Sequence, residues 1–452
     1  MTLATAAKVT GGELRGANVT FDAVSTDSRG IRKGELFVAL RGERFDGHDF
    51  LASAAAAGAA AALVDRAHVG SAPLPVTAVD DTTVALGVLA AHWRRQFHLP
   101  LIAVAGSNGK TTVKEMIAAC LRAGFGDAAV LATRGNLNNH IGVPLTLLAL
   151  REGHHAAVVE IGMNHPGETA QLAQMAVPTI ALVNNAQREH QEFMRSVADV
   201  AEEHASLIRA LPEDGVAVIN GDDPQAGLWR VAAASRQVRD FGLGVHNCVR
   251  AQCRPGPSSS LLELTTPEAQ AVFELPLAGA HNARNALGAI AAATAAGVPL
   301  AVCVDALSRF AAVKGRLQLK AGLRGATLID DTYNANPDSV RAAIDVLAGM
   351  PGRRLLVLGD MGEVGAQGAA FHEEVGAYAN QSGIDALYAL GDLSHASVRA
   401  FGSGGRHYKR IEDLLADVGN VLGPQTALLV KGSRFMQMER VVRSFEVSGA
   451  EA

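Results

Sequence analysis

The chain lacks most features that mark metal-rich, secreted or nucleic-acid-binding proteins. Only four of its 452 residues are cysteines, and no two of them form a C-x-x-C pair, which argues against a structural zinc site. So few cysteines are typical of free thiols in a reducing compartment. The net charge of −5 gives no basic excess, which argues against a broad nucleic-acid-binding surface.

A long apolar segment is also lacking. Residues 1–10 contain neither the apolar stretch nor the cleavage pattern of a secretory signal. The alanine-rich run 52–63 is interrupted by Gly58 and followed by Asp65 and Arg66, so we expect a packed helix there rather than a membrane span. With 48% hydrophobic and 19% charged residues, the chain is expected to be a cytoplasmic globular enzyme with no membrane insertion and no nucleic-acid partner.

The most informative motif is a glycine-containing loop between an apolar run, 101–105, and an amphipathic segment. The loop and the start of that segment are Gly106, Ser107, Asn108, Gly109, Lys110, Thr111 and Thr112. Such a loop points backbone N–H groups at phosphate oxygens, while Lys110 adds a positive charge and Thr111 offers a hydroxyl to Mg²⁺. The order strand, loop, helix therefore predicts a nucleotide-binding P-loop rather than a plain glycine turn.

The residues on either side of this loop give two further indications, one in favour of a P-loop and one of a departure from the general motif. The segment behind it places Val113, Met116, Ile117, Cys120 and Leu121 at helical spacing, which predicts a helix with one apolar face. The general motif has a further glycine where this chain has Val104, so we expect a shorter variant of the loop.

Apolar strands alternate with helices along the chain, which predicts an α/β protein of three domains. Residues 1–96 predict a small N-terminal α/β domain, 97–313 a central P-loop domain with a doubly wound parallel sheet, and 314–452 a C-terminal Rossmann-like α/β domain. The expected strands are 36–40, 62–64, 101–105, 130–132, 156–161, 179–183, 216–220, 327–330, 355–358, 386–390 and 427–430. Residues 254–260, rich in proline, glycine and serine, are expected to form a loop.

Polar residues follow several expected strands of the central domain, where ligands of open α/β sheets bind. Glu160 lies at the end of one strand and His190 follows the next, and both could bind Mg²⁺, although either one alone is more often structural. Asn136, Asn138, Asn139 and His140 form an amide-rich segment suited to sugar and diphosphate oxygens, or else an asparagine-rich turn. Asn282 and Asn285 begin an alanine-rich helix, where they either cap it or contact a nucleotide.

Three polar loops follow strands of the third domain. The first is the segment 330–339, in which Asp338 or Ser339 could cap a helix, although its other polar residues exceed what a cap needs. The second is 359–363, and the third, 431–434, places two cations at the same sheet edge. Together they predict a substrate face opposite the P-loop.

These segments together resemble the Mur ligase family over essentially the whole chain. The resemblance is carried by 25–29, 34–40, 42–48, the P-loop, 136–144, 160–168, 281–285, 314–316, 331–339, 358–363 and 431–434. The P-loop variant and the segment 281–285 are shared by all muramyl ligases and by folylpolyglutamate synthetase. The segment Tyr333-Asn334-Ala335-Asn336-Pro337 and residues 431–438 are similar to the member that adds a dipeptide.

The resemblance implies ATP-driven peptide bond formation through an acyl phosphate, with UDP-N-acetylmuramoyl-tripeptide and D-alanyl-D-alanine as substrates, ATP and Mg²⁺ as cofactors, and a monomeric chain. The implied catalytic residues are Lys110, His190, Arg316 and Lys431, and the implied metal ligands are Thr111, Glu160 and His190. Nucleotide contacts are implied for the P-loop, Asn282, Asn285, Arg316 and Asp331. Substrate contacts are implied for Asp27, Ser28, Arg29, Asn136, Asn138, Asn139, His140, Tyr333, Asn334, Asn336 and Arg434.

Two alternatives remain at this point. A P-loop regulator would hydrolyse ATP without ligation, and a folate enzyme of related fold would add glutamate. The first domain, with its segment 27–29, argues against both, because neither needs a domain for a nucleotide sugar.

The chain departs from the family at one position. Most muramyl ligases carry a lysine that CO₂ converts to a carbamate, which helps to hold a second Mg²⁺. Counting on from His190 places this position at His204, and no lysine lies between His190 and Lys314. Glu202 or Glu203 could supply the missing oxygen, or both could lie on a solvated helix face, with His204 a neutral spacer or a cation near phosphate. We expect activity that does not depend on bicarbonate, with the second metal held by His190, substrate oxygens, water and Glu203 if this residue supplies the missing oxygen.

Overall fold

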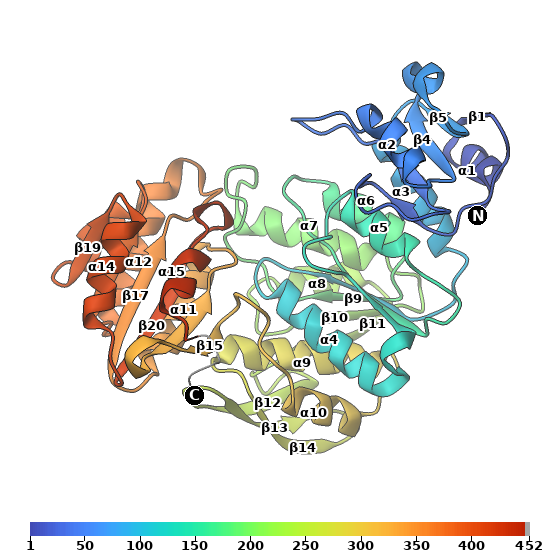
Figure 1. The fold of residues 1–452 in the computed structure, drawn as a ribbon. Helices are drawn as coiled ribbons and strands as arrows, with labels where there is room; N and C mark the ends of the chain where they lie inside the picture. The colour runs from blue at the N-terminus through green and yellow to red at the C-terminus, as the bar shows by residue number, and fades with distance from the viewer. Residues whose placement is uncertain (448–452) are drawn as a thin grey trace.

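The computed structural model describes residues 1–447, which form three α/β units (Figure 1). The central unit lies between a small N-terminal unit, blue in Figure 1, and a C-terminal unit in orange and red. This confirms the predicted three-domain α/β fold, and every expected strand is present to within two residues of its predicted ends. The boundaries at 96/97 and 313/314 stay predictions.

The N-terminal unit is a five-stranded sheet in the order β1-β5-β4-β3-β2. Its elements are α1 (Leu3–Thr10), β1 (Glu13–Arg15), β2 (Val24–Ser25), β3 (Leu36–Val38), α2 (Leu51–Ala56), β4 (Ala61–Asp65), β5 (Val76–Val79) and α3 (Thr82–Arg94). We expect a packed helix in the alanine-rich run 52–63, but only its first part is helical, because α2 ends at Ala56. Gly58, with φ of 101°, turns the chain in a conformation that favours glycine, and the run continues as β4.

The central unit is a nine-stranded sheet in the order β14-β13-β12-β11-β10-β9-β6-β8-β7. Its first elements are β6 (Leu101–Ala105), α4 (Lys110–Phe125), β7 (Val130–Ala132), α5 (Gly142–Leu148), β8 (Ala156–Glu160), α6 (Glu168–Ala176), β9 (Ile180–Val183), α7 (Val197–Arg209), β10 (Val216–Asn220) and α8 (Ala226–Ala233). It continues with β11 (Gln237–Gly242), β12 (Val249–Pro255), β13 (Ser260–Thr265), β14 (Gln270–Leu275), α9 (Ala280–Ala295) and α10 (Leu300–Ser308).

Strand β6 shows why the centre of this sheet is buried on both faces. Leu101, Ala103 and Ala105 belong to a core shared with α3, α5, α6 and α7, whereas Ile102 and Val104 belong to a core shared with α4 and α9. Successive side chains of a strand point to opposite faces, so the continuous apolar run is what a doubly covered strand requires. The parallel centre of the predicted sheet is confirmed.

The edge of the sheet beyond β11 differs from the expectation. Strands β12, β13 and β14 pair antiparallel and extend the parallel centre by two hairpins. The expected loop 254–260 is wrong at its ends, because Arg254 and Pro255 pair with Leu261 and Ser260 across the first hairpin. These strands alternate buried and exposed residues, so they carry no continuous apolar run that would have marked them.

The C-terminal unit is a six-stranded sheet in the order β15-β16-β20-β17-β18-β19, parallel except for the edge strand β15. Its elements are β15 (Gln318–Ala321), β16 (Thr327–Asp331), α11 (Pro337–Ala348), β17 (Arg353–Gly359), α12 (Gly368–Gln381), β18 (Ala386–Leu390), α13 (His395–Phe401), β19 (Gly405–Tyr408), α14 (Ile411–Val421), β20 (Thr426–Lys431) and α15 (Glu439–Phe445). Across residues 1–447, none of the helices combines the length and apolarity needed to span a membrane.

Candidate functional site

The predicted P-loop connects β6 to α4. Gly106 and Gly109 have φ values of 141° and 81°, and a Cβ atom at either would lie within 3.0 Å of asparagine atoms, 2.9 Å from Asn184 and 2.7 Å from Asn285. Only glycine fits both the backbone conformation and the space. The residues predicted to form the apolar face of α4 are all fully buried, namely Val113, Met116, Ile117, Cys120 and Leu121.

The P-loop opens into a cleft of about 980 Å³ between the central and C-terminal domains. Most sequence-predicted site residues line it: Ser107, Asn108, Gly109, Lys110, Thr111, Thr112, Asn136, Asn138, Asn139, His140, Glu160, His190, Asn282, Asn285, Arg316, Asp331, Tyr333, Asn334, Asn336, Lys431 and Arg434. Gly106, Asp27, Ser28 and Arg29 do not. Arg29 and Asp27 form an exposed ion pair at 2.8 Å, and the hydrogen bond from Arg29 lowers the pKa of Asp27 to about 2.

Thr111 and Glu160 meet at the mouth of the loop. The Thr111 hydroxyl donates to Oε1 of Glu160 at 3.3 Å, and Asn138 donates to the same oxygen at 2.8 Å. The other carboxylate oxygen of Glu160 is buried and has no hydrogen-bond partner. A buried carboxylate oxygen without a donor needs a cation or a donor to offset its burial, so the pair fits a site for Mg²⁺, which prefers oxygen ligands.

Lys110 lies folded over its own loop. Its Nζ donates to the carbonyl oxygens of Gly106 and Ser107, and it lies 3.2 Å from Oε2 of Glu189. Burial alone would raise the pKa of Glu189, but the charge of Lys110 and the hydrogen bond from His204 outweigh it and lower the pKa to about 2. The loop therefore faces an ionised carboxylate that the sequence interpretation did not include.

Hydrogen bonds of asparagine side chains connect the first turn of α9 to the P-loop. Asn184, at the end of β9, donates to the carbonyl oxygen of Asn108 at 2.8 Å and to Oδ1 of Asn285 at 2.9 Å. Asn285 in turn donates to Asn282 at 3.3 Å. Asn282 and Asn285 are both buried, so these predicted nucleotide contacts also brace the loop, and Asn184 is a member of the network that sequence reasoning missed.

The C-terminal domain presents its own charged pair. Lys431, at the end of β20, places Nζ 2.6 Å from Oδ2 of Asp331, and it also donates to the carbonyl oxygen of Asn334 at 2.9 Å. Arg316 stacks over the ring of Tyr333 at 4.2 Å and donates to Thr111 at 3.0 Å. Arg316 therefore links the C-terminal domain directly to the phosphate loop.

Further links cross the same boundary. Asn336 caps α11 by accepting from the N–H of Ser339 at 2.8 Å, and it donates to Asn108 at 2.9 Å. His190 has a left-handed backbone, with φ of 48°, and its Nδ1 lies 2.7 Å from Oε2 of Glu363. The interaction with His190 lowers the pKa of Glu363 below its usual value.

Three family models match successive parts of the chain. Residues 20–94 match the family described as Mur ligase family, catalytic domain; residues 104–293 match the Mur ligase middle domain; and residues 315–434 match the Mur ligase glutamate ligase domain. The chain belongs to the Mur ligase family.

Relatives and solved structures of the Mur ligase family cover nearly the whole chain. The chain is 42% identical to UDP-N-acetylmuramoyl-tripeptide–D-alanyl-D-alanine ligase of Escherichia coli K12, over 99% of both proteins. A crystal structure of MurF from Acinetobacter baumannii superimposes with a TM-score of 0.91 at 35% identity, covering 98% of each chain. MurF ligase from Thermotoga maritima in complex with ADP gives a TM-score of 0.82 at 26% identity, covering 93% of this chain and 96% of that one.

The residues around position 204, where this chain departs from most Mur ligases, make other contacts than expected. Glu203 is buried, and its two oxygens accept the backbone N–H groups of Gly167 at 2.8 Å and Thr169 at 2.7 Å. The hypothesis that Glu203 offers a free oxygen is therefore wrong, because it caps α6. Glu202 is exposed and pairs with Arg209 at 2.6 Å. His204 donates instead toward Glu189, which no local sequence pattern had marked.

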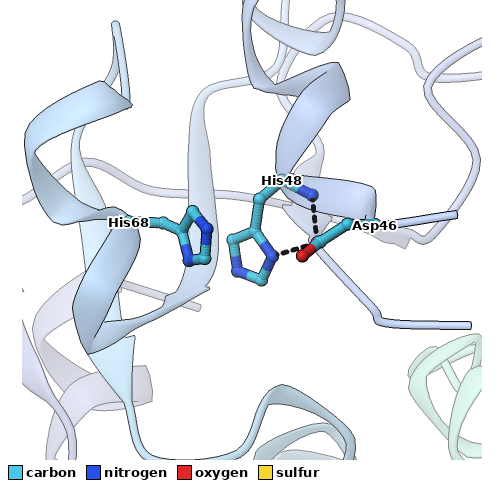
Figure 2. Close-up of side chains that lie close together, drawn as sticks. All are labelled: Asp46, His48 and His68. Atoms are coloured by element: carbon cyan, nitrogen blue, oxygen red, sulfur yellow. Dashed lines mark hydrogen bonds and ion pairs between the residues drawn. The ribbon is translucent and has the colours of Figure 1, made fainter.

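A second cluster of polar residues lies outside the cleft, in the N-terminal domain (Figure 2). Nδ1 of His48 lies 2.5 Å from Oδ1 of Asp46, and its Nε2 accepts the backbone N–H of Asp65 at 3.0 Å. The rings of His48 and His68 stack with centroids 4.0 Å apart. Because both ring nitrogens of His48 are already engaged, this imidazole connects the 3-10 turn Gly47–Phe50 to the end of β4 and is not free to bind a metal.

Proposed function

We propose that the protein is an ATP-dependent ligase that joins D-alanyl-D-alanine to UDP-N-acetylmuramoyl-tripeptide. The observation that carries this proposal is the bond from Arg316 to Thr111, which joins the phosphate loop to a second domain across one polar cleft. Relatives that bear this activity in their names match the chain from end to end, as the Escherichia coli protein does. The product is the pentapeptide precursor of the cell wall.

The reaction joins two anionic reactants before the peptide bond forms. The tripeptide carboxylate attacks the γ-phosphorus of ATP, so that an acyl phosphate forms and ADP leaves. The neutral amine of the dipeptide then attacks the acyl carbon, phosphate leaves with the bonding electrons, and the proton lost by the amine ends on the released phosphate. Lys110 and the loop N–H groups stabilise negative charge at the transferred phosphoryl group, and Arg316 adds a cation from the facing domain.

The residues around the loop fit a divalent cation. Thr111 and Glu160 would hold Mg²⁺, because the free oxygen of Glu160 is buried without a donor. His190 is the proposed ligand of a second ion. Bound Mg²⁺ would supply positive charge at the phosphate oxygens.

The substrates divide between the domains in this proposal. Asp27, Ser28 and Arg29 bind the uridine diphosphate, and the segment 136–140 contacts the muramyl-peptide side. Tyr333, Asn334 and Arg434 face the dipeptide, with Lys431 and Asp331 at the reacting end. ATP held between two domains would exclude water from the acyl phosphate, which hydrolyses readily. The enzyme is proposed to act as a monomer in the cytoplasm, on small molecules alone.

A coupled assay tests the proposal. The purified protein is given ATP and Mg²⁺, then nucleotide-tripeptide, then D-alanyl-D-alanine, and phosphate release is followed while mass spectrometry identifies the product. We expect little phosphate until both peptide substrates are present, and one peptide bond for each phosphate. Steady ATP hydrolysis without either substrate would identify a regulator, and turnover with a folate and glutamate would identify the folate enzyme.

A further inference from the structure

Among residues 1–447, Glu189 is the one carboxylate that lies within ion-pair distance of the phosphate-loop lysine, Lys110. It is 6% exposed, its Oε2 lies 3.2 Å from Nζ of Lys110, and its Oε1 lies 3.2 Å from Nε2 of His204. Nε2 of His190 lies 3.8 Å from the same Oε2. One lysine and two histidines, Lys110, His190 and His204, therefore lie around one buried carboxylate.

The pair with Lys110 cannot persist during the proposed reaction. The lysine of a P-loop is required at the β- and γ-phosphates of the nucleotide. When Lys110 turns to the phosphates, Glu189 keeps one hydrogen bond from His204 and loses its nearest full charge. A buried carboxylate without a counter-charge is strongly unfavourable, and a divalent cation supplies that charge.

His190 is placed to share such a cation. Its backbone φ of 48° is unusual for a residue other than glycine, and such conformations are enriched at active sites and ligand sites. Its Nδ1 lies 2.7 Å from Oε2 of Glu363 without hydrogen-bond geometry, and its Nε2 lies 3.8 Å from Oε2 of Glu189. A ring nitrogen and a carboxylate oxygen at that separation can contact one ion.

His204 fixes the orientation of the carboxylate. It is buried on α7, and its Nδ1 has no hydrogen-bond partner among the residues that the structure describes. Glu189 can only accept, so the proton of His204 lies on Nε2 and is donated to Oε1. This leaves Oε2 available on the side of His190.

We propose that Glu189 is a carboxylate ligand of a second divalent cation shared with His190, and that His204 is the residue that positions Glu189. The inference rests on the proposed function, because Lys110 leaves Glu189 only when a polyphosphate is bound. It also explains how a chain with histidine at position 204 supplies an anion without a modified lysine.

The first experiment counts bound Mn²⁺ by electron paramagnetic resonance. The protein is saturated with a non-hydrolysable ATP analogue and the nucleotide-tripeptide, and the dipeptide is omitted. We expect two ions per chain for the wild type, one for Glu189→Gln, and two for Glu202→Gln, which removes an exposed carboxylate from the same helix as His204. Two ions of wild-type affinity in a folded Glu189→Gln protein, or a single ion in the wild type, would overturn the inference.

A second variant covers a failure of Glu189→Gln to fold. Glu189→Asp keeps the charge but withdraws it by one methylene, and we expect the weaker Mn²⁺ ion to bind about 10-fold less tightly, as for changes that misplace a metal ligand. Unchanged affinity would contradict the assignment. Calorimetric binding of the nucleotide-tripeptide is measured separately, so that failure of the proposed function shows as lost tripeptide binding in the wild type.

The positioning role of His204 has its own readout. His204→Ala should weaken the second Mn²⁺ ion about 10-fold or more. A purely structural histidine would lower the melting temperature and leave the Mn²⁺ affinity unchanged.

A double variant, Glu189→Ala with His204→Lys, replaces the encoded carboxylate by a lysine that can add CO₂. The amine forms a C–N bond to CO₂ and releases a proton, which gives an anionic carbamate. We expect the second Mn²⁺ ion to bind in bicarbonate and to be lost in CO₂-free buffer, while the wild type binds two ions in both. A wild type that needs bicarbonate, or a double variant that binds two ions without CO₂, would refute the inference.

Discussion

Arg188 donates to Asp338 across the boundary between the central and C-terminal domains, with Nη2 2.6 Å from Oδ1. The same guanidinium pairs with Glu374 at 2.6 Å, and these two hydrogen bonds raise the pKa of Arg188 above its usual value. Two further hydrogen bonds cross the boundary nearby, from Asn336 to Asn108 and from Arg316 to Thr111. The cleft is thus held together by a few polar links rather than by a shared apolar core.

The first prediction concerns this ion pair. Arg188→Ala breaks the ion pairs with Asp338 and Glu374 at once. We expect kcat/KM for ATP to fall about 10-fold, which corresponds to about 1.4 kcal/mol. The radius of gyration from small-angle scattering should rise, because the domains separate more readily. Arg399→Ala is the matched control, since Arg399 pairs with exposed Glu373 within the C-terminal domain. Unchanged kinetics and dimensions would show that Arg188 does not hold the domains together.

The second prediction concerns Lys110. Lys110→Ala removes the cation of the phosphate loop, and we expect ligation to fall by about 10²-fold or more, as for the loss of one electrostatic stabiliser. The melting temperature should also fall, because buried Glu189 loses its counter-charge, so ligation is compared at a temperature where both proteins are folded. Lys409→Ala, an exposed lysine of the C-terminal domain, should ligate at the wild-type rate. A folded Lys110→Ala protein that ligates normally would remove the P-loop assignment.

The third prediction separates two roles of Asn336. Asn336→Ala loses both the cap of α11 and the bond to Asn108, so ligation and stability should fall together, the cap being worth about 1 kcal/mol. Asn336→Ser keeps a capping oxygen but is too short to reach Asn108, so ligation should fall while the melting temperature stays near wild type. Calorimetry should show unchanged binding of the nucleotide-tripeptide in both variants. A large loss of that binding would place Asn336 on the other substrate.

The fourth prediction concerns Glu203. Glu203→Gln keeps one acceptor for the first turn of α6 but loses the second acceptor and the charge that favours a helix N-terminus. We expect the free energy of unfolding to fall by about 1–3 kcal/mol, with an unchanged Mg²⁺ concentration for half-maximal activity. Glu202→Gln, on the exposed neighbour, should stay within about 0.5 kcal/mol of wild type. A shifted Mg²⁺ requirement in Glu203→Gln would return this residue to the metal site.

The sequence predicted the features that depend on neighbours along the chain. A strand, two glycines and Lys110 lie within ten residues, so the P-loop could be recognised, and continuous apolar strands revealed the parallel centre of the sheet. The edge strands β12 to β14 were missed because their exposed residues interrupt the apolar pattern.

The partners of individual side chains were beyond such reasoning. Glu203 and His204 are adjacent in sequence, yet one caps α6 and the other holds Glu189, because successive residues of a helix point about 100° apart. Nothing local distinguishes these two fates. The run of polar residues from Asn184 to His190, directly after β9, was a usable signal, but only its last member had been considered.

The contact between Lys110 and Glu189 also bears on which anions the loop accepts. Because the lysine already has an anion of its own beside it, an incoming anion must outcompete that carboxylate before it can occupy the loop. Free phosphate or sulfate offers charge and nothing more, whereas ATP adds its base, its ribose and a contact surface on a second domain. We therefore expect the built-in carboxylate to weaken the binding of free phosphate and sulfate to the loop more than the binding of ATP.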